Sequence, residues 1–191
     1  MGPSLRSAAL VLLAGLAGCA TFSELPPLPP RQDATPQGSV RVDVAERAFR
    51  TRADRSWAPS SADLPGEQVL VALRESGWFD PVGADLPDPD FTLSVTVRRD
   101  QDRLRGSLLS LATAFLIPST SDRSLAVAMT LRRDGEPARA CAVQRPYRIW
   151  HQLFLAPFWL SRGPANYEPE LVRRLARLCL QELLSAPSPA P

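Results

Sequence analysis

A cysteine near the start of the chain is the residue for which the sequence most directly indicates covalent chemistry. Cys19 closes the tetrad Leu16-Ala17-Gly18-Cys19, which ends an apolar run that starts at about Ala8. A cysteine thiol is a nucleophile that can be alkylated, and small residues at Ala17 and Gly18 let a peptidase close on the backbone. The apolar run is shorter than the roughly 20 residues that a spanning helix needs. The apolar run therefore does not predict a membrane span.

Together with the positive charges of Arg6 and the free amine, this tetrad resembles the lipobox signal peptide of bacterial lipoproteins. The resemblance covers residues 1–20 only. It implies that diacylglycerol is joined to Cys19, that cleavage follows Gly18, and that the new amine is acylated, for example with palmitate. Ala20 follows the cysteine, whereas an aspartate there would resemble an inner-membrane retention signal. The resemblance therefore favours an anchor in the outer membrane, facing the periplasm.

The other chemistry-bearing residues form no recognisable catalytic set. His151 is the only histidine and lies beside Trp150 in an apolar stretch, so we interpret it as a packing or interface residue rather than a base. The chain has no Gly-x-Ser-x-Gly elbow and no phosphate-binding glycine loop. Its net charge of +2 does not favour nucleic acid. We expect no enzymatic activity, no cofactor and no metal.

One acidic group needs an interpretation of its own. Asp80, Asp85, Asp88 and Asp90 alternate with prolines, a composition typical of a turn-rich loop that leads into a strand. Calcium binding is the alternative interpretation of the same residues.

Four segments are predicted from composition. Residues 1–18 form the lipoprotein signal peptide, and residues 19–38 carry the lipid and a Pro-rich tether. Residues 39–185 form a single periplasmic domain, and residues 186–191 form a disordered tail. A chain of 191 residues suits one domain of ordinary size.

Hydrophobic periodicity predicts the elements of that domain. Apolar residues alternate with polar ones in four strands, and apolar stripes at helical spacing predict two helices. Pro169 suits the first turn of the second helix, and Gly77 ends the first. The predicted strands are residues 40–44, 91–97, 125–131 and 139–149, and the predicted helices surround residues 69–73 and cover residues 169–184.

Two cysteines remain once Cys19 is lipidated. A hairpin loop at Asp134-Gly135 that is one residue longer than the tightest turn places Cys141 and Val143 on the face of Met129 and Leu131. Cys179 falls on the apolar stripe of the last helix. An oxidising compartment favours a disulfide between Cys141 and Cys179, with two buried thiols as the alternative.

Two stretches, residues 108–117 and 149–160, are unusually apolar. They form either core elements or an apolar surface that contacts the membrane, a lipid or a partner protein, with Trp side chains at headgroup depth. Pro157 breaks any helix through the second stretch, which favours an irregular segment. The candidate contact residues are Leu108, Leu109, Phe115, Trp150, Phe154, Phe158 and Trp159.

The element order predicts an α+β domain with a mostly antiparallel sheet of about four strands and helices packed on one face. In outline it resembles small periplasmic domains of outer-membrane lipoproteins, such as auxiliary lipoproteins of lipid-transporting ABC systems and activators of peptidoglycan synthases. That resemblance implies a membrane-anchored, non-enzymatic envelope protein that binds a lipid or a partner protein and assists envelope transport or assembly. An activator or scaffold of a cell-wall synthesis machine is one alternative, and a hydrolase with an unrecognised site is another.

Overall fold

A computed structural model describes residues 18–29, 35–49, 64–101, 112–113, 116–133, 138–152, 155 and 163–185. These residues form one six-stranded sheet in the order β1-β6-β5-β4-β2-β3, together with two long helices. The elements are β1 (Gly18–Thr21), β2 (Val40–Phe49), α2 (Leu64–Ser76), β3 (Val82–Gly83), β4 (Phe91–Gln101), β5 (Ser119–Arg132), β6 (Arg139–Gln152) and α5 (Pro164–Ser185).

The α+β class is confirmed, but the prediction of about four mostly antiparallel strands is wrong. Within the described residues the sheet is mixed and has six strands. β2 and β4 run parallel, with Val40 opposite Phe91, and β2 also pairs in parallel with β3. A parallel pair needs a long crossover, usually a helix, and the segment between β2 and β4 contains α2. The two added strands, β1 and β3, are only four and two residues long.

The chain divides into two compact units. Unit 1 comprises residues 1–24, 101–123 and 146–168, and unit 2 comprises residues 25–100, 124–145 and 169–191. β5, β6 and α5 therefore contribute residues to both units.

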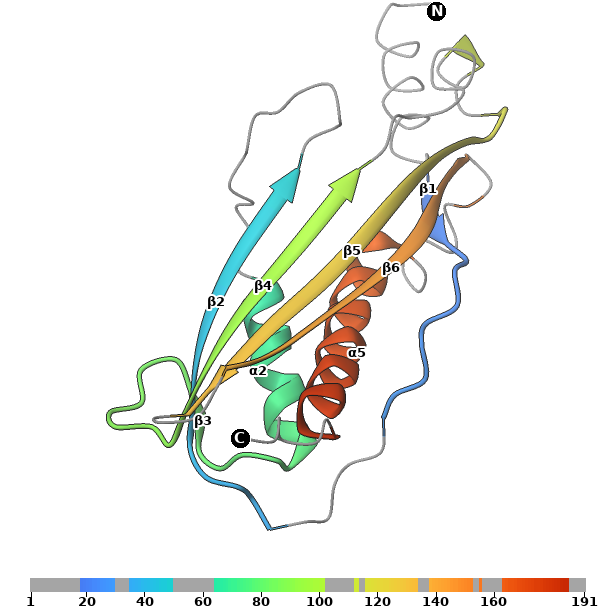
Figure 1. The fold of residues 1–191 in the computed structure, drawn as a ribbon. Helices are drawn as coiled ribbons and strands as arrows, with labels where there is room; N and C mark the ends of the chain where they lie inside the picture. The colour runs from blue at the N-terminus through green and yellow to red at the C-terminus, as the bar shows by residue number, and fades with distance from the viewer. Residues whose placement is uncertain are drawn as a thin grey trace, which may run out of the picture. The chain divides into compact units, whose positions relative to one another are not determined.

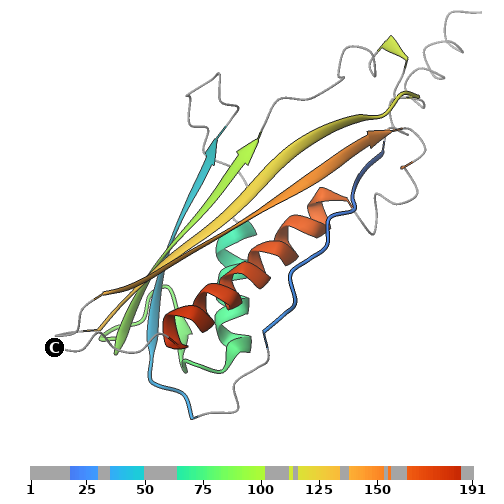
Figure 2. The same ribbon diagram turned by 45° about the vertical axis from the view of Figure 1, so that its right-hand side comes forward.

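Unit 2 is a two-layer arrangement in which α2 and α5 cover one face of the sheet (Figures 1 and 2). Its apolar side chains alternate along the strands: Leu125, Val127 and Met129 are buried, while the residues between them are partly exposed. α5 buries Leu175 and Leu183 at helical spacing. Each such side chain contributes about 1.5–3 kcal/mol by leaving water, so this apolar layer is the main stabilising element of unit 2.

The end of α2 agrees with its sequence. Gly77 has a φ of 75°, the left-handed conformation that commonly ends a helix. Phe79, two residues later, is buried and packs edge-on against Phe91 with ring centroids 5.4 Å apart. The glycine thus turns an aromatic side chain into the core.

The start of α5 differs from its sequence prediction. The helix begins at Pro164, so Pro169 lies inside it rather than in its first turn. A proline at this position cannot donate a hydrogen bond to the carbonyl of Ala165. Ala165 is exposed, so water can satisfy that carbonyl, and the helix tolerates the proline.

Candidate functional site

The predicted processing site coincides with strand β1. The backbone of Gly18–Thr21 pairs antiparallel with the end of β6, with Gly18 opposite Gln152 and Cys19 opposite His151. Ala20 and Thr21 are buried, at 0% and 3% exposure. The residue predicted to carry the lipid therefore belongs to the edge of the folded sheet in unit 1.

The residues that follow β1 are also held by hydrogen bonds. In unit 1, the backbone N–H of Arg148 donates to Ser23 Oγ at 3.1 Å. In unit 2, Arg174 Nη1 donates to the carbonyl oxygen of Pro26 at 2.7 Å, and both Pro26 and Pro29 are buried. The predicted tether thus contacts unit 1 at Ser23 and unit 2 at Pro26.

A half-buried polar cluster joins β5, β6 and the first turns of α5 in unit 1. Glu168 Oε1 accepts a hydrogen bond from Tyr147 Oη at 2.6 Å and another from Arg123 Nη1 at 3.0 Å. Tyr147 also packs against Tyr167, with ring centroids 5.4 Å apart. The arginine compensates the buried carboxylate, whose removal from water would otherwise be costly. Through these hydrogen bonds Glu168 of α5 links β5 to β6.

His151 lies beside this cluster and is hydrogen-bonded to a serine. Its Nε2 is 3.1 Å from Ser121 Oγ. Burial lowers the pKa of His151, and the positive charge of Arg123 lowers it further, so the ring is neutral at pH 7. A serine beside a neutral histidine is the arrangement of an activated nucleophile. Ser121 is only 1% exposed, however, so a substrate cannot reach its hydroxyl in this conformation.

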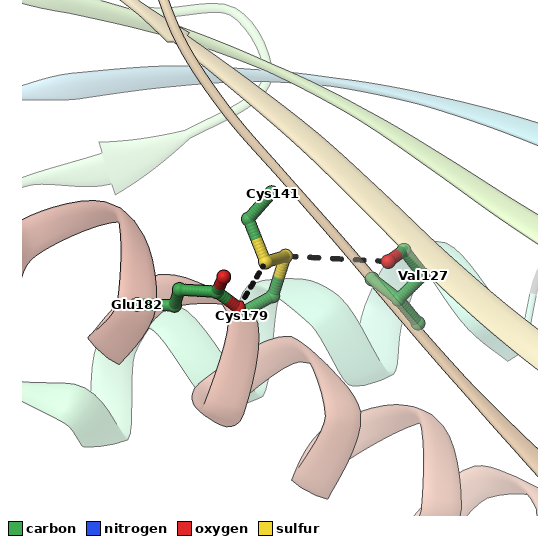
Figure 3. Close-up of a disulfide and its surroundings, with 4 residues drawn as sticks. All are labelled: Val127, Cys141, Cys179 and Glu182. Atoms are coloured by element: carbon green, nitrogen blue, oxygen red, sulfur yellow. Dashed lines mark hydrogen bonds between the residues drawn. A yellow bond between two sulfur atoms is a disulfide. The ribbon is translucent and has the colours of Figure 1, made fainter. Parts of the chain in front are cut away.

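The predicted disulfide between Cys141 on β6 and Cys179 on α5 is formed (Figure 3), with Cα atoms 5.6 Å apart. Cys141 is 6% exposed and Cys179 is fully buried. Glu182 Oε2 lies 3.3 Å from the Cys141 sulfur, and since a disulfide sulfur carries no proton, this approach is a contact rather than a hydrogen bond. Met129, Leu131 and Cys141 are all buried, as the longer hairpin loop predicts, and the loop itself at Asp134-Gly135 lies outside the described residues.

The acidic loop before β4 has a structural role at Asp90. Its Oδ2 accepts hydrogen bonds from the backbone N–H of Ser39 at 2.8 Å and from the Ser39 hydroxyl at 2.7 Å. These two bonds lower the pKa of Asp90 and tie the start of β2 to the start of β4. Among the described residues, no group of three or more His, Cys, Asp or Glu side chains could hold a metal ion.

The predicted contact surface is only partly described. Trp150 lies on β6 opposite Ala20 and is half-buried. The other predicted contact residues, Leu108, Leu109, Phe115, Phe154, Phe158 and Trp159, lie outside the described residues.

Two exposed residues at the end of the first apolar stretch were not singled out from the sequence. Leu116 and Ile117 are 53% and 41% exposed. The signal that marks them is Pro118, which follows them directly and which a continuing helix would not accommodate. No helix within the described ranges is long and apolar enough to cross a membrane.

Comparison with known proteins gives structural similarity only. No family model and no curated protein matches the chain. A Xanthomonas campestris protein of the family DUF330 is similar with a TM-score of 0.41 and 15% identity, covering 84% of this chain and 91% of that one. A minor lipoprotein from Acinetobacter baumannii is similar with a TM-score of 0.43 and 16% identity, covering 80% of this chain and 96% of that one.

Proposed function

We propose that this chain is a lipoprotein of the bacterial envelope, anchored by lipid on Cys19 to the outer membrane, and that it binds a lipid or a partner protein without catalysing a reaction. The observation that carries the proposal is the tetrad Leu16-Ala17-Gly18-Cys19, a sequence suited to thiol alkylation and to cleavage before Cys19. Cleavage after Gly18 would leave Cys19, Ala20 and Thr21 of strand β1 paired with β6 in the mature chain.

The absence of enzymatic activity rests on the geometry of the polar groups. Among the described residues, Ser121 and His151 are arranged like a catalytic pair, but Ser121 is buried. The neighbouring Glu168 already accepts hydrogen bonds from Tyr147 and Arg123. These contacts favour a structural role for the polar cluster of unit 1 over acid–base chemistry.

Mass spectrometry of the N-terminal peptide, combined with membrane fractionation, tests the anchor. We expect a mature chain that begins at Cys19 and carries the mass of a diacylglyceryl group, recovered in the outer-membrane fraction. Cys19→Ala should remove the lipid and release the protein from the membrane, whereas Cys141→Ala should leave the lipid in place. A wild-type chain without lipid on Cys19 would refute the proposed anchor.

Affinity purification of the anchored protein from its own membrane tests the binding role. Mass spectrometry of both the co-purified proteins and the co-purified lipids separates the two versions of the proposal. A bound lipid supports a part in lipid transport, and a protein recovered in constant ratio supports a scaffold or activator. Recovery of neither from native membranes would contradict a binding role.

A further inference from the structure

The residue predicted to carry the lipid is itself part of the folded unit 1, with no free linker between them. The backbone of Cys19 pairs with that of His151, and the next two residues, Ala20 and Thr21, are buried. Ser23 then accepts a hydrogen bond from the backbone of Arg148. A lipid on Cys19 therefore begins at the edge strand of unit 1, and the bilayer that holds this lipid lies next to that edge.

The same end of unit 1 contains the start of β5. His151 is paired with Cys19 on one side and is hydrogen-bonded through its side chain to Ser121 of β5 on the other. β5 begins at Ser119, two residues before Ser121. The start of β5 and the end of β6 therefore lie together with β1 (Figure 1), which brings the residues just before β5 to the lipid-bearing end.

Two of those residues, Leu116 and Ile117, are hydrogen-bonded to Thr113 and present apolar side chains to the outside. The backbone N–H of Leu116 donates to the Thr113 carbonyl oxygen at 3.0 Å, and that of Ile117 donates to Thr113 Oγ1 at 3.3 Å. Leu116 and Ile117 are 53% and 41% exposed. Leu116 and Ile117 thus offer exposed apolar surface that an apolar partner would cover.

We propose that unit 1 lies directly on the bilayer that holds its own lipid, with Leu116 and Ile117 inserted at the boundary between headgroups and acyl chains. The inference rests on the proposed lipidation of Cys19. The lipid on Cys19 keeps Leu116 and Ile117 at the membrane surface. These two side chains then strengthen a membrane attachment that the lipid has already made, as the second signal does in two-signal anchors.

Photocrosslinking of the lipidated, full-length mature protein in phosphatidylethanolamine–phosphatidylglycerol vesicles tests this proposal. A photoreactive benzoylphenylalanine replaces Leu116, Ile117 or, as a matched control, Leu28. Leu28 is also an exposed leucine, at 38%, and it lies on the segment that follows the anchor. We expect lipid adducts at positions 116 and 117 in several-fold higher yield than at position 28, as measured by mass spectrometry.

The alternative occupants of this surface appear as other outcomes of the same experiment. Crosslinks from positions 116 and 117 to a second protein chain would overturn the proposal in favour of a protein interface. Equal lipid yields at positions 116, 117 and 28 would overturn it as well. The N-terminal mass of each sample separates this inference from the proposed function: with Cys19 lipidated and no adducts, only the inference fails, whereas without lipid on Cys19 both fail.

Discussion

Different kinds of interaction are found inside each of the two compact units. Unit 2 packs two helices against one face of the sheet through alternating apolar side chains, and a disulfide joins its last helix to β6. In the described part of unit 1, polar contacts join Tyr147 and Arg123 to Glu168 and His151 to Ser121, and Ala20 and Ile149 are also buried. The comparison assigns the disulfide and the helix-covered face of the sheet to unit 2, whereas unit 1 contains the anchor residue on which the proposed function depends.

The largest expected effect comes from removing the disulfide of unit 2. The double substitution Cys141→Ala and Cys179→Ala removes a bridge between residues 38 apart in sequence, which should lower the free energy of unfolding by about 3–4 kcal/mol. Urea unfolding of the Cys19→Ala protein, with and without the double substitution, measures this loss. Amide exchange shows where the loss falls: a loss of protection confined to unit 1 would contradict the role assigned to unit 2.

The polar cluster of unit 1 provides the next effect. Glu168→Gln removes the negative charge that accepts hydrogen bonds from Arg123 and Tyr147. Hydrogen bonds to charged groups contribute about 1.5–3 kcal/mol each. We expect urea unfolding to show a loss of that order, because Arg123 then keeps its charge without a counterion. Glu67→Gln is the matched control, since Glu67 is exposed in the first turn of α2. An equal loss in the control variant would count against the cluster.

The pKa of His151 predicts a smaller, pH-dependent effect. Its folded-state pKa is lowered from the ordinary value of 6.5 by burial and by Arg123, so the unfolded chain binds the proton first as the pH falls. Stability should therefore decrease from pH 7.5 toward pH 5, and level off below the folded-state pKa. His151→Gln should flatten this part of the profile. Parallel urea midpoints for the two proteins over that range would contradict the prediction.

The smallest effect concerns unit 2. Hydrogen bonds from Ser39 lower the pKa of Asp90, so the ionised side chain stabilises the fold above its unfolded-state pKa, and this contribution is lost as the pH falls through the folded-state pKa. Asp90→Asn should lower the urea midpoint slightly at pH 7 and by a smaller amount near pH 3. Asp85→Asn, also in the exposed loop, serves as the control. A constant deficit for Asp90→Asn at both pH values would rule out a charge effect.

Most of the elements could be predicted from the sequence because their apolar patterns have the period of the element. Alternation at Leu125, Val127 and Met129 identifies β5, and the helical stripe that includes Cys179 identifies α5. The helical stripe placed Cys179, and the choice of the longer hairpin loop placed Cys141 on the apolar face of its strand; the disulfide between them agrees with both placements.

The direction of β2 relative to β4 could not be predicted in the same way, because alternation specifies which face is buried and contains no information on strand direction. The useful signal was the long connection that contains α2, which suits a parallel crossover. β1 was missed for another reason: its four residues are too few for a pattern, and they adjoin the Pro-rich segment. The sequence thus predicted Cys19 as the reactive residue of the candidate site, but it did not predict that Cys19 lies on an edge strand of the sheet.

Strand β1 also determines how the protein should be shortened for biochemical work. A truncation that removes the lipid-bearing residue and the linker after it would avoid the lipid. It would also remove the strand that covers the edge of β6 and would expose unpaired N–H and C=O groups at the end of β6. Bare strand edges pair with other chains, so a protein that begins after Pro29 should self-associate, whereas one that begins at Ala20 should keep most of this cover.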